Sequence, residues 1–132
     1  MRLIDVYRFA DSATYLYALL AEREPCQSIS HQRMPTVDEH LAFVRSVPYS
    51  RWYLVEIEPD TIVGAVYVTK HDEIGIAIFK EHRKKGYARA AIDAIRARHE
   101  GRLLANINPA NEPSIQLFTG LGAQLIQATY QL

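Results

Sequence analysis

The sequence predicts an α+β fold in which helices flank a mixed, mainly antiparallel sheet, in the order β-α-α-β-β-β-α-β-α-β. Three observations predict it. Apolar residues recur at helical spacing in several separate segments, and three consecutive runs rich in β-branched and aromatic residues are divided only by short turns. A basic turn that contains one glycine then joins the third of these runs to an alanine-rich helix.

The N-terminal part of the chain is predicted to form one strand and two helices. Residues 2–9 read as a strand, and residues 12–22 read as a packed helix. Thr36 is followed three residues later by Glu39, which is the spacing of a capping box. This pair predicts the start of a second helix that runs to about residue 44.

An antiparallel meander is predicted for the middle of the chain. The runs 51–58, 61–69 and 73–79 are rich in β-branched and aromatic residues, and the turn sequences "PD" and "KHD" separate them. Such short connections favour strands that pair with their neighbours in the chain.

The C-terminal part is predicted to alternate helices and strands. Residues 87–99 place apolar side chains at helical spacing, and residues 103–107 read as a buried strand. Asn111 predicts the cap of a helix that ends at Gly122. Residues 123–132 read as a last strand.

Length and composition predict one domain over residues 1–132. The single cysteine, Cys26, has no partner for an internal disulfide, and no Cys/His spacing resembles a zinc site. No apolar run approaches the roughly 20 residues that span a bilayer. We therefore expect a cytoplasmic protein without a metal site and without a membrane partner.

The charge of the chain is balanced overall but not locally. The formal net charge is +0, whereas residues 80–102 hold eight Lys and Arg against three Asp and Glu. Because the basic excess is confined to one turn and the helix after it, it favours a compact phosphate group over a nucleic acid. A solvated basic turn that binds nothing is the alternative.

The turn and the segments around it resemble the GNAT superfamily of acyl-CoA-dependent N-acyltransferases. The best-known motif of that family, Gln/Arg-x-x-Gly-x-Gly/Ala, is met by residues 83–88, which lie between a predicted strand and a predicted helix. A second signature, Asn-x-x-Ser/Ala-x-x-x-Tyr-x-x-x-Gly-Phe, is met in part. Asn111, Ser114 and Gly122 match it, while Phe118 replaces the tyrosine and Ala123 replaces the phenylalanine.

The resemblance implies that the anion is the nucleotide end of acetyl-CoA, bound as a cosubstrate. Gly86 lacks a Cβ, so the backbone there can approach a pyrophosphate closely. The strand before the turn would pair with the pantetheine arm, as it does in the family. The implied cofactor-binding residues are Ile76, Ala77, Ile78, Phe79, Arg83, Lys84, Lys85, Gly86, Tyr87, Ala88, Arg89, Asn111, Ser114 and Phe118.

Candidate catalytic and acceptor-binding residues also follow from the resemblance. Several family members place a catalytic carboxylate near the position of Glu73, whose other interpretation is an ordinary charge at a strand end. Because Phe118 has no proton to give, water or Tyr130 would protonate the leaving thiolate. In the family the loop between the two early helices lines the acceptor pocket, which here would bring His31 and Arg33 to the acceptor.

The resemblance therefore implies a single acetyltransferase domain that moves an acetyl group directly from acetyl-CoA to an amine. A small polar acceptor such as an amino sugar is expected. Three alternatives stay open: a catalytically silent acyl-CoA-binding module, a protein N-terminal or lysine acetyltransferase, and an RNA-binding domain that uses the basic helix. The expected state is a monomer or a homodimer, and no nucleic-acid partner is expected.

Overall fold

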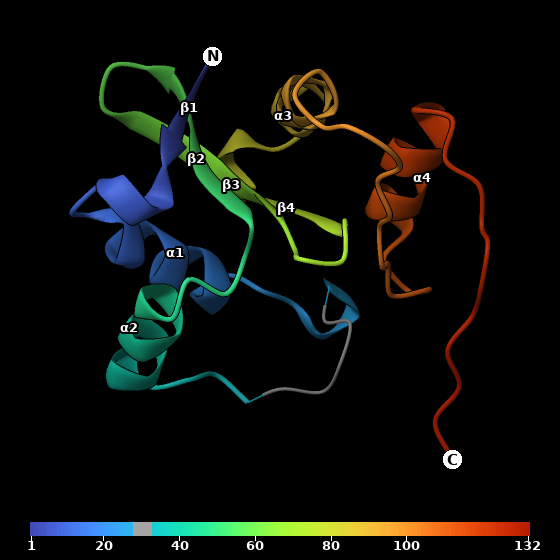
Figure 1. Ribbon diagram of the computed structural model, residues 1–132, viewed down its shortest axis with the longest axis horizontal. Helices are drawn as coiled ribbons and strands as arrows, with labels where there is room; N and C mark the ends of the chain where they lie inside the picture. The colour runs from blue at the N-terminus through green and yellow to red at the C-terminus, as the bar shows by residue number, and fades with distance from the viewer. Residues whose placement is uncertain (28–32) are drawn as a thin grey trace.

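The structure is a computed structural model that describes residues 1–27 and 33–132. A central sheet lies between two groups of helices (Figure 1). Its strands are β1 (Arg2–Asp5), β2 (Arg51–Glu58), β3 (Thr61–Val68) and β4 (Ile74–Ile78). The helices are α1 (Ser12–Ala21), α2 (Val37–Arg45), α3 (Tyr87–Arg96) and α4 (Glu112–Gly120). Short 3₁₀ turns lie at Val6–Arg8, Pro25–Gln27 and Lys80–His82.

The sheet has the strand order β1-β2-β3-β4, and every pairing between these strands is antiparallel. The predicted meander is therefore confirmed, and β2 has the predicted bounds. The register of β2 on β3 shifts on either side of Glu56. Close packing of β3 on β4 requires Gly64, because a Cβ there would lie 2.1 Å from the carbonyl oxygen of Ala77.

Each face of the sheet buries its own apolar cluster, because side chains alternate between the faces of a strand. On one face Val55, Val66 and Ile74 pack with Ile92 and Ile95 of α3. On the other face Trp52, Leu54 and Ala65 pack with Leu16 and Leu19 of α1. The predicted α+β fold class is confirmed.

Local caps explain where several elements begin and end. The first strand stops at Asp5, short of residue 9, because the Asp5 carboxylate accepts the Tyr7 N–H at 2.9 Å and caps a 3₁₀ turn. The predicted capping box at α2 is present, with both the Thr36 and the Glu39 side-chain bonds formed. The helix predicted over 87–99 ends at Arg96.

Two predicted strands are absent from the described part of the chain. Residues 103–107 form one parallel bridge, between Leu104 and Glu73, and then diverge from β4. Residues 123–132 form no strand, and Leu125 and Tyr130 are 89% and 88% exposed. An alternating pattern forms a strand only when it pairs with a free edge, and the tail pairs with none among the described residues.

The contact at Gly64 predicts the effect of adding a methyl group there. Gly64→Ala should lower the free energy of unfolding by about 1–3 kcal/mol, because the added methyl group meets a backbone carbonyl that cannot rotate away. Urea denaturation measures the loss. The matched control is Gly120→Ala at the end of α4, where a Cβ meets nothing within 4 Å, and it should be neutral or slightly stabilising. Equal stability of the Gly64 variant and the parent would contradict the packing.

Candidate active site

The turn between β4 and α3 has the backbone shape of an anion site. Lys84 and Gly86 both have positive φ, at 62° and 83°, and Gly86 is the N-cap of α3 without a side-chain cap. The N–H groups of the first helical turn have no partner within the helix, and the helix dipole is positive there. A Cβ built on Gly86 meets nothing within 4 Å, so the space above the turn is open.

Arg83 connects this turn to the end of β4. Its Nε donates to the carbonyl oxygen of Ile78 at 3.0 Å, and the residue is half-buried. Lys84, Lys85 and Arg89 are exposed around the turn. The residues predicted to neutralise phosphate therefore lie together, with Arg83 fixed and the others facing solvent.

The outer edge of β4 is open at Ile76. Glu73 and Phe79 bond to β3, since the Glu73 carbonyl accepts the Thr69 N–H at 2.8 Å and the Phe79 N–H donates to Val63 at 2.9 Å. Hydrogen-bonding directions alternate along a strand, so the Ile76 N–H and C=O point away from β3. Neither group has a partner among the described residues, because the segment that follows Leu104 has already diverged.

Glu73 is held at the start of β4 by two side chains. Its carboxylate accepts hydrogen bonds from Thr69 Oγ1 at 3.0 Å and from Asn106 Nδ2. The Glu73 N–H also donates to Thr69 Oγ1, at 3.2 Å. The carboxylate therefore has a fixed orientation, and Asn106 reaches it because residues 104–106 cross the end of β4.

Tyr67, which the sequence did not indicate, lies close to Glu73, and a second tyrosine, Tyr49, stacks on Tyr67. The ring of Tyr67 rests on Gly75, where a Cβ would lie 2.0 Å from Tyr67 Cζ. The Tyr49 ring stacks on Tyr67 with centroids 4.0 Å apart and planes at 7°. Burial raises the pKa of the Tyr67 phenol, and the positive charge of Arg23 opposes that shift.

Tyr67 of β3 is directly opposite Gly75 of β4, so both lie on the same face of the sheet. Glu73 lies on this face too, because it precedes Gly75 by two residues. This is the face that α1 covers, opposite to the face that α3 covers. One signal was available in the sequence, because Gly75 interrupts a run of bulky residues, and such a glycine marks a close approach.

The second predicted motif forms the start and the buried face of α4. Asn111 caps the helix, and its side chain accepts the Ser114 N–H at 3.3 Å. Phe118 is 8% exposed and packs in the cluster that includes Ile74 and Ile92. The structure thus gives both residues a structural role, and it places Phe118 on the α3 side of the sheet.

Arg33, predicted to bind the acceptor, is paired with another side chain, and Tyr130, predicted to donate a proton, is exposed. Arg33 makes a bidentate pair with Glu39, at 2.9 and 3.1 Å, and this pair lowers the pKa of Glu39 to about 2. His31 lies outside the described residues. Tyr130 lies on the exposed tail.

The described residues show neither a metal centre nor a membrane-spanning helix. No group of three or more His, Cys, Asp or Glu in residues 1–27 and 33–132 has the arrangement of a metal site. Within the same ranges, no helix is both long enough and apolar enough to cross a membrane.

Comparison with known families and structures gives a consistent result. The chain matches the acetyltransferase (GNAT) family over residues 14–128. No significant match was found among curated proteins.

Three solved structures illustrate the likeness of fold. A chimera of the spermidine N-acetyltransferase from Vibrio cholerae is 18% identical, with a TM-score of 0.72 over 92% of this chain and 81% of that one. An acetyltransferase from Salmonella typhimurium with its cofactor acetyl-CoA is 18% identical, with a TM-score of 0.65 over 92% and 76%. A ribosomal-protein-alanine N-acetyltransferase from Brucella melitensis is 19% identical, with a TM-score of 0.69 over 99% and 96%.

Proposed function

The chain belongs to the acetyltransferase (GNAT) family, and we propose that it transfers an acetyl group from acetyl-CoA directly to the amine of a small polar acceptor. One observation carries this proposal. The open backbone edge at Ile76 and the unfilled space above Gly86 are the two ends of one path. The Ile78 carbonyl, which Arg83 contacts, lies between them. A ligand with an amide-bearing arm at one end and a pyrophosphate at the other is complementary to this path, and acetyl-CoA is such a ligand.

The residues of the turn and of β4 bind different parts of acetyl-CoA in this proposal. The N–H groups of residues 85–88 face the pyrophosphate, with Arg83, Lys85 and Arg89 supplying positive charge. Ile76 offers one N–H and one C=O to the amides of the pantetheine arm. The Salmonella typhimurium structure, solved with acetyl-CoA, supports this ligand.

The chemistry assigns a role to Glu73. An amine with a pKa near 10 is mostly protonated at neutral pH, so it must lose a proton before it attacks the thioester carbonyl. We assign Glu73 as the base, acting directly or through a water molecule, because Thr69 and Asn106 fix its carboxylate. A C–N bond forms, the C–S bond breaks, and the thiolate leaves.

Solvent is the proposed proton source for the leaving thiolate. Phe118 has no acidic proton, and Tyr130 is 88% exposed on the tail, so we leave Tyr130 out of the mechanism. A thiol with a pKa near that of cysteine, about 8.5, is a tolerable leaving group without a dedicated acid.

The acceptor is proposed from the face of the sheet that carries Glu73. The Tyr67 ring near this carboxylate, with Tyr49 stacked on it, suits a small amine with an apolar or ring-shaped body. The Arg33 guanidinium is paired with Glu39, so it contributes less to acceptor binding than expected. The expectation of an amino sugar as the acceptor, which rested in part on Arg33, therefore has less support. The spermidine enzyme supports a small amine, and the Brucella melitensis enzyme supports a protein N-terminus as the alternative.

Turnover separates an enzyme from a silent acyl-CoA-binding module. A panel of polyamines, amino sugars, aromatic amines and N-terminal peptides, assayed for thiol release from acetyl-CoA, should give one class that turns over. Binding of coenzyme A without thiol release across the panel would support the silent module instead.

The anion site gives a prediction with a matched control. Acetyl-CoA at a hundredfold excess over Kd should stabilise the folded protein by about 2.7 kcal/mol, measured as a rise in Tm. Gly86→Val should abolish that rise, because the side chain fills the open space and a β-branched residue disfavours φ of 83°. Gly101→Val carries the same strain at φ of 84°, beyond the other end of α3, and should keep the rise. A full rise in the Gly86 variant would reject the site.

The role of Glu73 gives a second prediction. Glu73→Gln should lower kcat by roughly a hundredfold at neutral pH, with partial recovery at high pH, where the free amine is abundant. Glu58→Gln, at the exposed end of β2, serves as the control and should leave kcat unchanged. If the variant has the same kcat as the parent at every pH, the Glu73 carboxylate has a structural role only.

The phenylalanine at position 118 gives a third prediction. Phe118→Tyr should raise kcat by at most about tenfold, or roughly 1.4 kcal/mol of transition-state stabilisation, because solvent already supplies the proton. Steady-state kinetics of both proteins measure the ratio. A rise of a thousandfold from near-zero activity would show instead that the natural protein retains its acyl-CoA site for binding only.

A further inference from the structure

A positive charge lies beside the stacked pair of Tyr49 and Tyr67. Arg23 follows the end of α1 by two residues and is exposed. Burial raises the pKa of both tyrosine phenols, and the charge of Arg23 opposes both shifts. The guanidinium therefore lies close to the two hydroxyl groups, on the face of the sheet that α1 covers.

Lys80 holds the residues on either side of Arg23. The Lys80 N–H donates to Glu22 Oε1 at 2.8 Å, and Lys80 Nζ lies 3.5 Å from Glu24 Oε1. The Arg23 N–H itself donates to the Leu20 carbonyl at 3.0 Å. Because Lys80 comes two residues after β4, these contacts hold Arg23 near the end of that strand.

The charge of Arg23 has no partner of opposite sign among residues 1–27 and 33–132. The neighbouring carboxylates of Glu22 and Glu24 contact Lys80, and Arg23 forms no ion pair in these ranges. The two phenols do not neutralise it, because a pKa raised above the ordinary value of about 10 keeps them uncharged at neutral pH. An unpaired, planar guanidinium fits a carboxylate, which it binds through two parallel hydrogen bonds.

A negative charge lies close to the same tyrosine. Besides burial, the charge of Glu73 raises the pKa of the Tyr67 phenol, whereas the charge of Arg23 lowers it. Glu73 and Arg23 thus present opposite charges close to one hydroxyl group. A molecule that carries both an amine and a carboxylate is complementary to this pair of charges, whereas a polyamine meets repulsion at Arg23.

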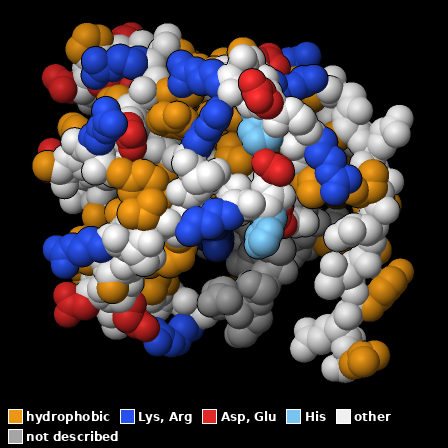
Figure 2. All heavy atoms as spheres, viewed as in Figure 1, with side chains coloured by type: hydrophobic (Ala, Val, Ile, Leu, Met, Phe, Trp, Pro, Cys, Tyr) orange, Lys and Arg blue, Asp and Glu red, His pale blue; other side chains and the backbone are white. Residues whose placement is uncertain are grey.

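Charges of both signs are mixed over the face of the molecule seen in Figure 2. Lys and Arg side chains are interspersed there with Asp and Glu, and the net charge of the chain is +0. The attraction of a small acceptor therefore depends on the charged side chains close to it, and not on a field of one sign over the whole molecule.

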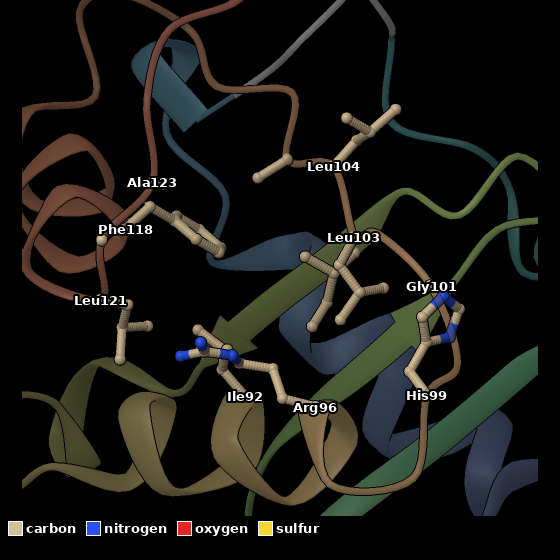
Figure 3. Close-up of a pocket in the computed structure, with 12 residues that line it drawn as sticks. Ile92, Arg96, His99, Gly101, Leu103, Leu104, Phe118, Leu121 and Ala123 are labelled. Carbon is tan, nitrogen blue, oxygen red and sulfur yellow. The ribbon is translucent and has the colours of Figure 1, made fainter.

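An apolar pocket of about 320 Å³ lies on the other face of the sheet and is separate from this site. Its lining includes Ile74, Ile92 and Phe118, which belong to the cluster between the sheet and α3. Figure 3 shows Ile92 of α3 and Phe118 of α4 on two sides of this pocket. Neither Arg23 nor Glu73 lines it, so the acceptor is assigned from the face that α1 covers.

We propose that the acceptor is an amino acid whose carboxylate binds Arg23 and whose amine faces Glu73. The assignment rests on the proposed acetyl transfer, of which it names the acceptor class. The amine gives a proton to Glu73, its nitrogen attacks the thioester carbonyl, a C–N bond forms and the C–S bond breaks. The thiolate takes a proton from solvent, and the products are an N-acetylated amino acid and coenzyme A. The carboxylate of the acceptor is unchanged and serves to bind and orient it.

Matched acceptors test this assignment with the unaltered protein. The common amino acids are assayed for thiol release from acetyl-CoA, and the best of them is compared with its amide and with the amine that lacks the carboxyl group. The amino acid should have a kcat/KM at least about tenfold higher than either analogue, because both analogues lose the charge-assisted pair with Arg23. The amide is a stringent comparison, since loss of the nearby carboxylate lowers the pKa of its amine and increases the fraction of free amine.

Variants of Arg23 connect the preference to this side chain. Arg23→Gln should lower the ratio of kcat/KM for the amino acid to kcat/KM for its amide by about tenfold, mainly through a higher KM for the amino acid. Arg23→Lys keeps the charge without the planar fork and should give an intermediate ratio. Arg45→Gln removes a positive charge at the exposed end of α2 and, as the matched control, should keep the ratio of the parent. An equal fall in kcat/KM for both acceptors in Arg23→Gln would assign Arg23 to structure and overturn the proposal.

The outcomes distinguish a wrong acceptor class from a wrong reaction. If polyamines, peptides or the amide react as well as the amino acid, acetyl transfer stands and the acceptor class is wrong. If no amine releases thiol, the proposed acetyl transfer fails, and the acceptor class fails with it. Circular dichroism checks that each variant is folded.

Discussion

The parallel bridge between Glu73 and Leu104 is the contact on which the candidate site depends. Leu104 commits its N–H and C=O to β4, and the chain then diverges instead of extending the sheet. The divergence leaves the Ile76 backbone without a partner among the described residues and brings Asn106 onto the Glu73 carboxylate. A full ladder between the two segments would pair the Ile76 backbone.

The basic turn gathers positive charge at one point of a chain whose net charge is zero. Two positive φ values in three residues turn the backbone so that the N-terminus of α3 faces open space, and Arg83 ties the turn to the end of β4. The helix dipole and the unpaired N–H groups then act together with the nearby cations. The positive charge is local, because acidic residues elsewhere in the chain keep the sum at zero.

Prediction from the sequence succeeded where short-range chemistry decides the structure. The capping box at Thr36, the strand over 51–58 and the glycine turn at Gly86 each depend on residues within a few positions of one another. It failed for residues 103–107 and 123–132, whose patterns resemble strands. A pattern reports which side chains seek burial, but a strand also needs a neighbouring backbone edge, and that edge comes from distant parts of the chain.

The sequence by itself determined the fold class, the antiparallel meander, the family resemblance and the position of the glycine turn before α3, because apolar periodicity and motif spacing encode them locally. Only the tertiary structure decided that Thr69 and Asn106 hold Glu73, that Tyr67 lies on Gly75, and that Glu39 occupies Arg33. The contacts of Asn106 and Tyr67 join different segments of the chain, so register and packing fix them. The nearby Arg33 and Glu39 also pair, and the capping box at the start of α2 holds the same Glu39 side chain.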